Sequence, residues 1–171
     1  MKLSNRCPIN ADAATVWAGL LDPEVLKACV PGCTEMSGSA QEGFEATVIQ
    51  KVGPVKATFK GSVALSQMVE PHSLTISGEG KGGAAGFAKG SADVRLELDG
   101  DITILHYDVE AKVGGKLAQL GSRIIDSFAK KMADQFFENF SDAMGESVAN
   151  ENVDNTEDTQ KKKGWFKRLV S

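Results

Sequence analysis

The side chains best suited to covalent or metal chemistry in this 171-residue chain are three cysteines and two histidines. Cys29 and Cys33 stand close enough in sequence to suggest a metal or redox pair. A structural zinc site normally needs four ligands at motif spacing, and neither a second cysteine pair nor a nearby histidine completes this one. We therefore expect no metal site, and we interpret the cysteines, Cys7 included, as small packing residues that remain free thiols.

The two histidines give little basis for catalysis. His72 follows Pro71 in an expected turn. His106 falls on the polar face of an expected strand, where we expect it to be solvated and to have no orienting partner. No G-x-S-x-G sequence supplies a nucleophile elbow. We therefore predict that the protein is not an enzyme, and we assign no catalytic residue.

A glycine-rich stretch at residues 78–86 (GEGKGGAAG) invites comparison with a phosphate-binding loop. It lacks the Lys-Ser/Thr ending of a P-loop, and no dinucleotide-binding fingerprint opens a helix here. We interpret the stretch as a flexible hairpin or bulge between two strands. As an alternative, its small residues could keep a cavity mouth open or let a partner approach closely.

The last eleven residues, 161–171 (KKKGWFKRLVS), combine five bases with four large apolar side chains and contain no acid. In a helix the apolar side chains would share one side, a combination typical of segments that bind an anionic membrane surface. A solvated basic tail and a docking peptide for a partner are the alternatives. The predicted membrane-binding residues are Lys161, Lys162, Lys163, Trp165, Phe166, Lys167, Arg168, Leu169 and Val170.

The charges divide the chain into three parts. Residues 1–145 carry 14 Lys/Arg and 18 Asp/Glu, whereas residues 146–160 carry five acids and no base. The overall charge of −4 argues against a nucleic-acid-binding protein. Because the acidic stretch cannot bury enough apolar area to order itself, we predict a domain at 1–147, a flexible linker at 148–160 and an anchoring tail at 161–171.

The apolar periodicity predicts an α+β domain. A strand at 2–9 precedes two short helices, and residues 33–113 then alternate apolar and polar side chains, which predicts six antiparallel strands. Apolar residues at every third or fourth position from 116 to 147 predict one long helix. Together these elements predict a helix-grip fold, in which a curved antiparallel sheet of about seven strands wraps around a long C-terminal helix, with two short helices after the first strand.

A helix-grip domain commonly encloses a cavity between its helix and its sheet. A mostly apolar lining with few polar groups suits a hydrophobic small molecule. A filled core is the alternative. The predicted cavity lining is Phe44, Phe59, Ile76, Phe87, Leu117, Leu120, Ile124, Phe128 and Met132.

Three separated blocks of sequence resemble one protein family. They are residues 21–33 (LDPEVLKACVPGC), residues 51–63 (KVGPVKATFKGSV) and residues 115–125 (GKLAQLGSRII), the last continuing into Phe136-Phe137. In this order they resemble the CoxG family, which is named for a subunit of carbon monoxide dehydrogenase and falls within the START/Bet v 1-like (SRPBCC) superfamily. The resemblance spans residues 1–145 and implies the helix-grip fold.

The same resemblance implies partners and a function. It implies a non-catalytic accessory protein that holds a molybdenum hydroxylase of the CO dehydrogenase type at the cytoplasmic membrane, where electrons reach the respiratory chain. A respiratory quinone, menaquinone or ubiquinone, would then suit the cavity, and no covalently bound cofactor is expected. The alternatives are a stand-alone carrier of a hydrophobic ligand or lipid, and an assembly factor for a molybdenum hydroxylase.

The sequence also predicts where the protein works. It begins with no recognisable secretion signal, and no apolar stretch approaches the roughly 18–20 residues that span a bilayer. Together with free thiols and the basic tail, this predicts a cytoplasmic protein that is peripheral on the inner face of the cell membrane.

Overall fold

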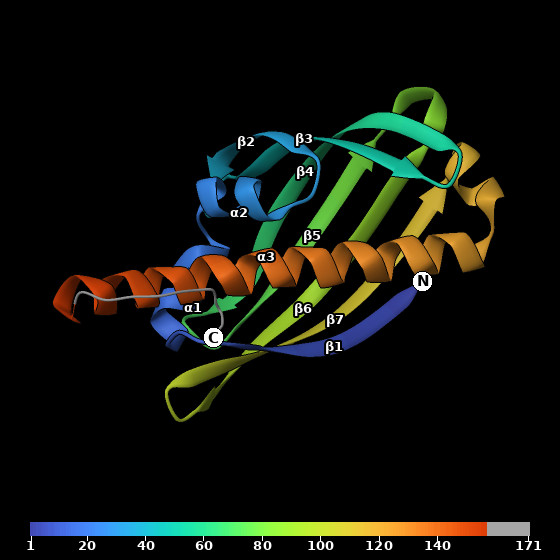
Figure 1. Cartoon of the computed structure of the whole chain (residues 1–171). Coiled ribbons are helices and arrows are strands. Elements are labelled where there is room, and N and C mark those ends of the chain that lie inside the picture. Colours follow the sequence, from blue (N-terminus) through green and yellow to red (C-terminus); the bar gives the residue numbers. More distant parts are fainter. Residues whose placement is uncertain (157–171) are drawn as a thin grey trace.

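The computed structural model describes residues 1–156, with side chains to residue 145. Seven strands form one antiparallel sheet in the order β1-β7-β6-β5-β4-β3-β2, and one long helix, α3, crosses the face around which the sheet curves (Figure 1). The predicted α+β helix-grip architecture is confirmed. The strands are β1 (Lys2–Ile9), β2 (Cys33–Ser39), β3 (Gly43–Val52), β4 (Val55–Val69), β5 (Ser73–Lys81), β6 (Phe87–Asp99) and β7 (Ile102–Gly114).

Two short helices connect β1 to β2, the two edge strands of the sheet, as predicted. Each begins at an aspartate whose carboxylate accepts a hydrogen bond from a backbone N–H. Asp12 accepts from Thr15 at 2.8 Å, and Asp22 accepts from Glu24 at 2.9 Å. These caps satisfy N–H groups that have no partner inside the helix. The two helices are α1 (Ala13–Leu20) and α2 (Pro23–Cys29).

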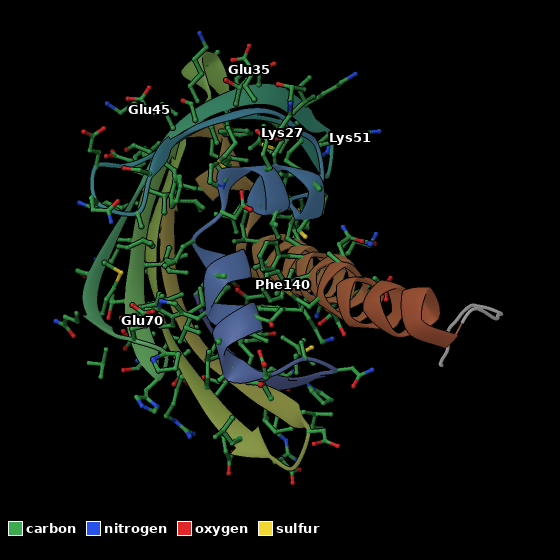
Figure 2. All side chains as sticks on the ribbon, turned by 90° about the vertical axis from the view of Figure 1, so that its left-hand side faces the viewer. Lys27, Glu35, Glu45, Lys51, Glu70 and Phe140 are labelled. Carbon is green, nitrogen blue, oxygen red and sulfur yellow. The ribbon has the colours of Figure 1, made fainter. Side chains whose placement is uncertain are left out.

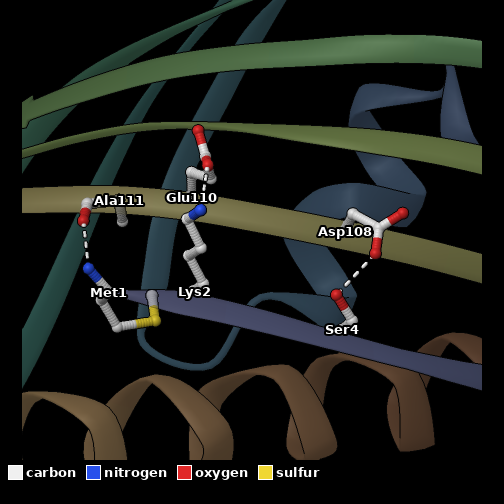
Figure 3. A network of polar contacts seen from close by, with 6 residues as sticks. All are labelled: Met1, Lys2, Ser4, Asp108, Glu110 and Ala111. Carbon is white, nitrogen blue, oxygen red and sulfur yellow. Dashed lines mark hydrogen bonds and ion pairs between the residues drawn. The ribbon is translucent and has the colours of Figure 1, made fainter.

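The N-terminal strand β1 pairs with β7 along its whole length, and Figure 3 shows the polar contacts at its start. The Met1 ammonium donates to the carbonyl oxygen of Ala111 at 3.0 Å, and Lys2 Nζ lies 3.3 Å from Glu110 Oε2. The Lys2–Glu110 pair is highly exposed, so water screens it and it adds little stability. The backbone hydrogen bonds between β1 and β7 therefore hold β1 in the sheet.

The long helix starts later and ends later than the periodicity predicts. A short 3₁₀ helix, η2 (Gly115–Leu120), comes first, and Gly121 then takes a φ of 92° that a right-handed helix cannot continue through. α3 itself spans Ser122–Thr156. It therefore runs on through the first nine residues of the segment interpreted as a linker; residues 157–160 lie outside the described part of the chain.

The hydrophobic core lies at the end of the sheet nearest α1. Phe140, from the second half of α3, is fully buried there beside α1 and the sheet (Figure 2). Tyr107 of β7 stacks on Phe137 with ring centroids 4.4 Å apart. The buried Thr103 hydroxyl donates to the carbonyl oxygen of Ala11 at 2.8 Å, so this polar group is satisfied. The part of α3 from Phe136 to Met144 is thus firmly packed.

The sheet face turned toward α3, here called the inner face, is covered unevenly. At the α1 end its side chains, such as Leu74 and Leu105, are buried. Toward the other end all inner-face residues of β4–β7 are only half-buried, and most are glycine or alanine. Because such small residues do not reach α3, solvent gains access here. We call this region the open half: Ala57, Phe59, Gly61, Val63, Gly78, Gly80, Ala88, Gly90, Ala92, Ala111 and Val113.

Candidate ligand-binding groove

A groove of about 720 Å³ runs between α3 and the neighbouring part of β3. Ligand sites for small molecules typically enclose roughly 300–1,000 Å³. Three apolar side chains of α3 line the groove, and bases stand among them without any acid. The lining residues are Pro31, Gln50, Lys51, Gly53, Arg123, Ile124, Ser127, Phe128, Lys131, Met132 and Gln135. The arrangement offers an apolar surface with a few polar groups, which suits a hydrophobic ligand that carries polar ends.

Glycines let the chain close up around this groove. Gly53, with a φ of 57°, forms the turn between β3 and β4, and a Cβ there would lie 3.6 Å from Ile124. Gly32, with a φ of 79°, passes so close to β3 that a Cβ would come within 2.1 Å of the Ile49 carbonyl oxygen. Only glycine fits that second position. Gly53 therefore brings the β3–β4 turn against α3, and Gly32 brings the α2–β2 connection against β3.

Side-chain hydrogen bonds fix the wall that Pro31 provides. The Gln50 amide of β3 donates to the carbonyl oxygen of Pro31. On the other side, the Asn139 amide of α3 donates to the carbonyl oxygen of Cys29 at 3.0 Å. The α2–β2 connection is therefore tied to the sheet and to the helix at once.

The structure separates the predicted cavity residues into groups. Ile124, Phe128 and Met132 line the groove. Phe59 lies in the open half, and Ile76 is half-buried at the border between the open half and the core. The others are accounted for by packing: Phe44 and Leu117 are buried, and Leu120 is half-buried, near Gly53.

Phe87 is the exception, because it does not face α3. Strand alternation from the buried Val94 and Leu96 places Phe87 on the opposite face of β6, here called the outer face, where it is 41% exposed. Its ring lies over Gly114 of β7, so close that a Cβ on Gly114 would fall 2.3 Å from it. Phe87 therefore covers a cross-strand glycine and is removed from the candidate cavity lining.

The glycine-rich stretch is a connection between strands, as interpreted. It comprises the end of β5, a single 3₁₀ turn, η1 (Gly83–Ala85), and Gly86. Gly86 has a φ of 111°, and a Cβ there would lie 2.0 Å from the Gly114 carbonyl oxygen. Gly82 lies under the ring of Phe59 in the same way. These glycines permit close backbone packing.

The histidines lie away from the groove. His106 lies on the outer face, as expected, but its Nε2 is 2.7 Å from Glu97 Oε1, so the expectation that it has no partner is wrong. The hydrogen bond from His106 is the main cause that lowers the pKa of Glu97. His72 is exposed in the β4–β5 turn. The pair of Glu97 and His106 is thus a surface contact of neighbouring strands.

The cysteines are packing residues of two kinds. Cys29 is buried, whereas Cys7 and Cys33 are half-buried, and all three are free thiols. Burial raises the pKa of Cys7 to about 11 and also raises that of Cys29. Since the thiolate is the reactive and metal-binding form, burial makes these two thiols inert. In the part of the chain that the structure describes, no group of three or more potential metal ligands comes together.

Two further observations bear on the membrane. None of the helices, as far as the described residues go, is long and apolar enough to cross a bilayer. The predicted membrane-binding residues at 161–171 lie outside those residues. The tail is therefore a sequence-based prediction.

The architecture and the groove define a class: a helix-grip domain whose sheet leaves part of its concave face accessible beside the long helix. Solved structures share this fold. A conserved protein from Geobacillus kaustophilus is 24% identical, with a TM-score of 0.80, covering 86% of this chain and 97% of its own. A protein from Thermus thermophilus is 11% identical, with a TM-score of 0.62, covering 88% and 99%. At these identities the likeness establishes the fold alone.

A comparison of families identifies the chain more closely. The model of the CoxG family, described as a subunit of carbon monoxide dehydrogenase, matches residues 6–145. The protein therefore belongs to the CoxG family, which confirms the resemblance seen in the sequence blocks and links the chain by family to carbon monoxide dehydrogenase. Among curated proteins no relative matched the chain.

Proposed function

We propose that this protein is a non-catalytic accessory of a molybdenum hydroxylase of the CO dehydrogenase type. In this role it recruits the hydroxylase to the cytoplasmic membrane and links it to the respiratory chain by binding a respiratory quinone, menaquinone or ubiquinone, beside α3. Membership of the CoxG family supports the choice of partner. No covalently bound cofactor takes part in this proposal.

The main support for a bound ligand is the open half of the inner face. A domain that served only as a scaffold would gain stability by filling this region, since each buried CH₂ contributes about 0.8 kcal/mol. Instead the inner face presents glycine and alanine at most positions there, and Phe59 and Val63 stay half-buried. Close backbone approach accounts for Gly61 and Gly90, whereas Gly78 and Gly80 have room for a side chain. Small side chains at the centre of a sheet leave room for an apolar molecule.

The groove supplies a second argument. Its apolar residues Ile124, Phe128 and Met132 belong to α3. The amide groups of Gln50 and Gln135 donate to Pro31 and Asn139, and each has a second N–H that a ligand can use. A quinone has a flat apolar ring, two carbonyl oxygens that accept hydrogen bonds and a long apolar tail. The chemistry of the lining matches that of such a ligand.

The tail, residues 161–171, provides the membrane attachment in this proposal. Each base near an anionic leaflet contributes about 1 kcal/mol, and Trp165 and Phe166 prefer the headgroup boundary. Five bases would give about 5 kcal/mol before the cost of ordering the tail. Such attachment would be reversible and weakened by salt.

The experiment is a capture of the tagged full-length protein from native membranes without denaturing detergent. Recovery of a molybdenum- and flavin-containing hydroxylase with bound isoprenoid quinone supports the proposal. Isoprenoid without the hydroxylase supports a stand-alone carrier, which the open half favours equally. The hydroxylase without isoprenoid, especially in its cofactor-free form, supports an assembly factor. Recovery of neither refutes the proposed function.

A further inference from the structure

The positive charge of the domain is gathered at the end farthest from α1, where the β3–β4 turn, η1, η2 and the start of α3 meet (Figure 1). Three segments build this end: residues 51–60, 80–91 and 111–125. Together they contain eight Lys/Arg and no Asp/Glu, whereas the remainder of residues 1–145 contains six Lys/Arg and 18 Asp/Glu. The domain is therefore strongly polarised, although its net charge is small.

Six of these bases share the outer face of the sheet, and they oppose each other in pairs. The strand register places Lys51 directly opposite Lys56, Lys60 opposite Lys81, and Lys89 opposite Lys112. Directly opposed like charges destabilise an antiparallel sheet. We call these six residues the lysine face.

Within the described part of the chain, few acidic side chains offset the positive charge of the lysine face. All six lysines are exposed, and none of them takes part in the ion pairs found there, which join Lys2 to Glu110, His106 to Glu97, and Lys130 to Asp134. Two acids adjoin the face: Glu79, directly opposite Lys89, and Glu110, two positions before Lys112 on β7. Lysines often protect the edge of a sheet from aggregation, but here they occupy β3–β7, and the edges are β1 and β2. Edge protection therefore does not account for them.

Large apolar side chains are exposed among the lysines. Phe87, 41% exposed, stands directly opposite Lys81, and Ile49, 42% exposed, lies two positions before Lys51 on β3. A patch of bases with an exposed aromatic and an aliphatic side chain suits the headgroup region of a bilayer, where bases meet lipid phosphates and apolar groups enter the acyl boundary.

We propose that the lysine face, with Phe87 and Ile49, docks the folded domain directly onto an anionic phospholipid bilayer. Lipid phosphates relieve the repulsion in all three lysine pairs at once, while the acidic remainder of the domain stays away from the surface. This contact is separate from the tail, because α3 ends at the opposite side of the domain (Figure 1). It goes beyond the proposed function and stands whether or not the tail binds lipid.

The test compares two full-length triple variants on vesicles of 70% phosphatidylcholine and 30% phosphatidylglycerol. Lys56→Gln, Lys60→Gln and Lys81→Gln disrupt the lysine face. The control changes three bases away from the lysine face and has the same net charge: Arg6→Gln, Lys27→Gln and Lys130→Gln. At roughly five-fold per lysine, the lysine-face variant should bind on the order of 100-fold more weakly, and the control should bind within a few-fold of wild type.

Thermal melting separates binding from folding. The lysine-face variant should melt no lower than wild type, because removing like charges relieves repulsion. A third variant, Trp165→Ala with Phe166→Ala, tests the tail. If this variant binds vesicles normally and the lysine-face variant does not, the tail is not the membrane anchor and the lysine face is the binding surface.

Equal binding of the lysine-face variant and the control would overturn the docking proposal. So would unchanged vesicle binding by the lysine-face variant combined with lost capture of the hydroxylase, since that result would assign the face to an acidic protein surface.

Discussion

A larger side chain at Gly80 tests whether the open half is space that a side chain or ligand can occupy. Gly80 lies on the inner face of β5, and a Cβ built there meets only the Cβ of Phe59, at 3.9 Å. The substitution Gly80→Leu would therefore extend a side chain into accessible space. Replacing a strand glycine gains about 0.5–1 kcal/mol from the unfolded state, and burying part of four carbons adds about 1 kcal/mol. We expect the free energy of unfolding of the variant to exceed that of wild type by about 1–2 kcal/mol.

The assay is urea unfolding followed by circular dichroism, together with thermal melting. For a chain of this size the expected gain corresponds to a rise of roughly 2–8 °C in the melting temperature. The same variant should lose a hydrophobic ligand, because the new side chain takes its place. Stability and ligand content should thus change in opposite directions.

Gly90→Ala provides the matched control on the neighbouring strand. A Cβ at Gly90 would lie 2.6 Å from the carbonyl oxygen of Glu110, so even one methyl group must push the backbone. We expect a loss of about 1–3 kcal/mol. If Gly80→Leu is destabilised as much as Gly90→Ala, the inner face is already filled and the reasoning about the open half is refuted.

Three smaller predictions follow from single contacts. Asp12→Ala should lower stability by about 1 kcal/mol at neutral pH. Because the hydrogen bonds from Thr15 lower the pKa of Asp12 from its usual 3.8, that difference should shrink as the pH falls below this value; a difference constant from pH 7 to pH 2.5 would contradict the cap. Cys7, whose pKa rises from 9.0 to about 11, should form about 100-fold less thiolate at pH 8 than an ordinary thiol, and mass spectrometry should find iodoacetamide labelling slow until urea is added. Asn139→Ala should cost about 1–2 kcal/mol in urea unfolding, because it leaves the carbonyl oxygen of Cys29 without its donor, and an unchanged midpoint would show that the α2–α3 tie is unimportant.

Strand alternation and helical periodicity were sufficient to predict the fold. The seven strands, the aspartate-capped helices and the single long helix each follow from patterns within about ten to thirty residues. The start of α3 could not be predicted in this way, since the apolar spacing continues through η2 and only the positive φ of Gly121 interrupts it. Its extension to Thr156 depends on hydrogen bonds within the helix, which need no apolar face.

The candidate site was harder to predict, because it depends on which face each residue occupies. Phe87 was assigned to the cavity although the alternation of Val94 and Leu96, continued back along β6, places it on the outer face. The Glu97–His106 contact and the lysine pairs join residues of neighbouring strands, so they become visible only when the register is known. Ile124, Phe128 and Met132 were predictable because they share one stripe of a regular helix.

The central claim, that the domain carries a respiratory quinone beside α3, is tested most directly by the ligand content of the purified protein. Full-length wild type and the Gly80→Leu variant are isolated from their native membranes under mild conditions, extracted with organic solvent and analysed by mass spectrometry. The account predicts close to one isoprenoid quinone per wild-type chain and a strong reduction in the variant. Wild-type protein that contains neither quinone nor any other lipid would contradict it.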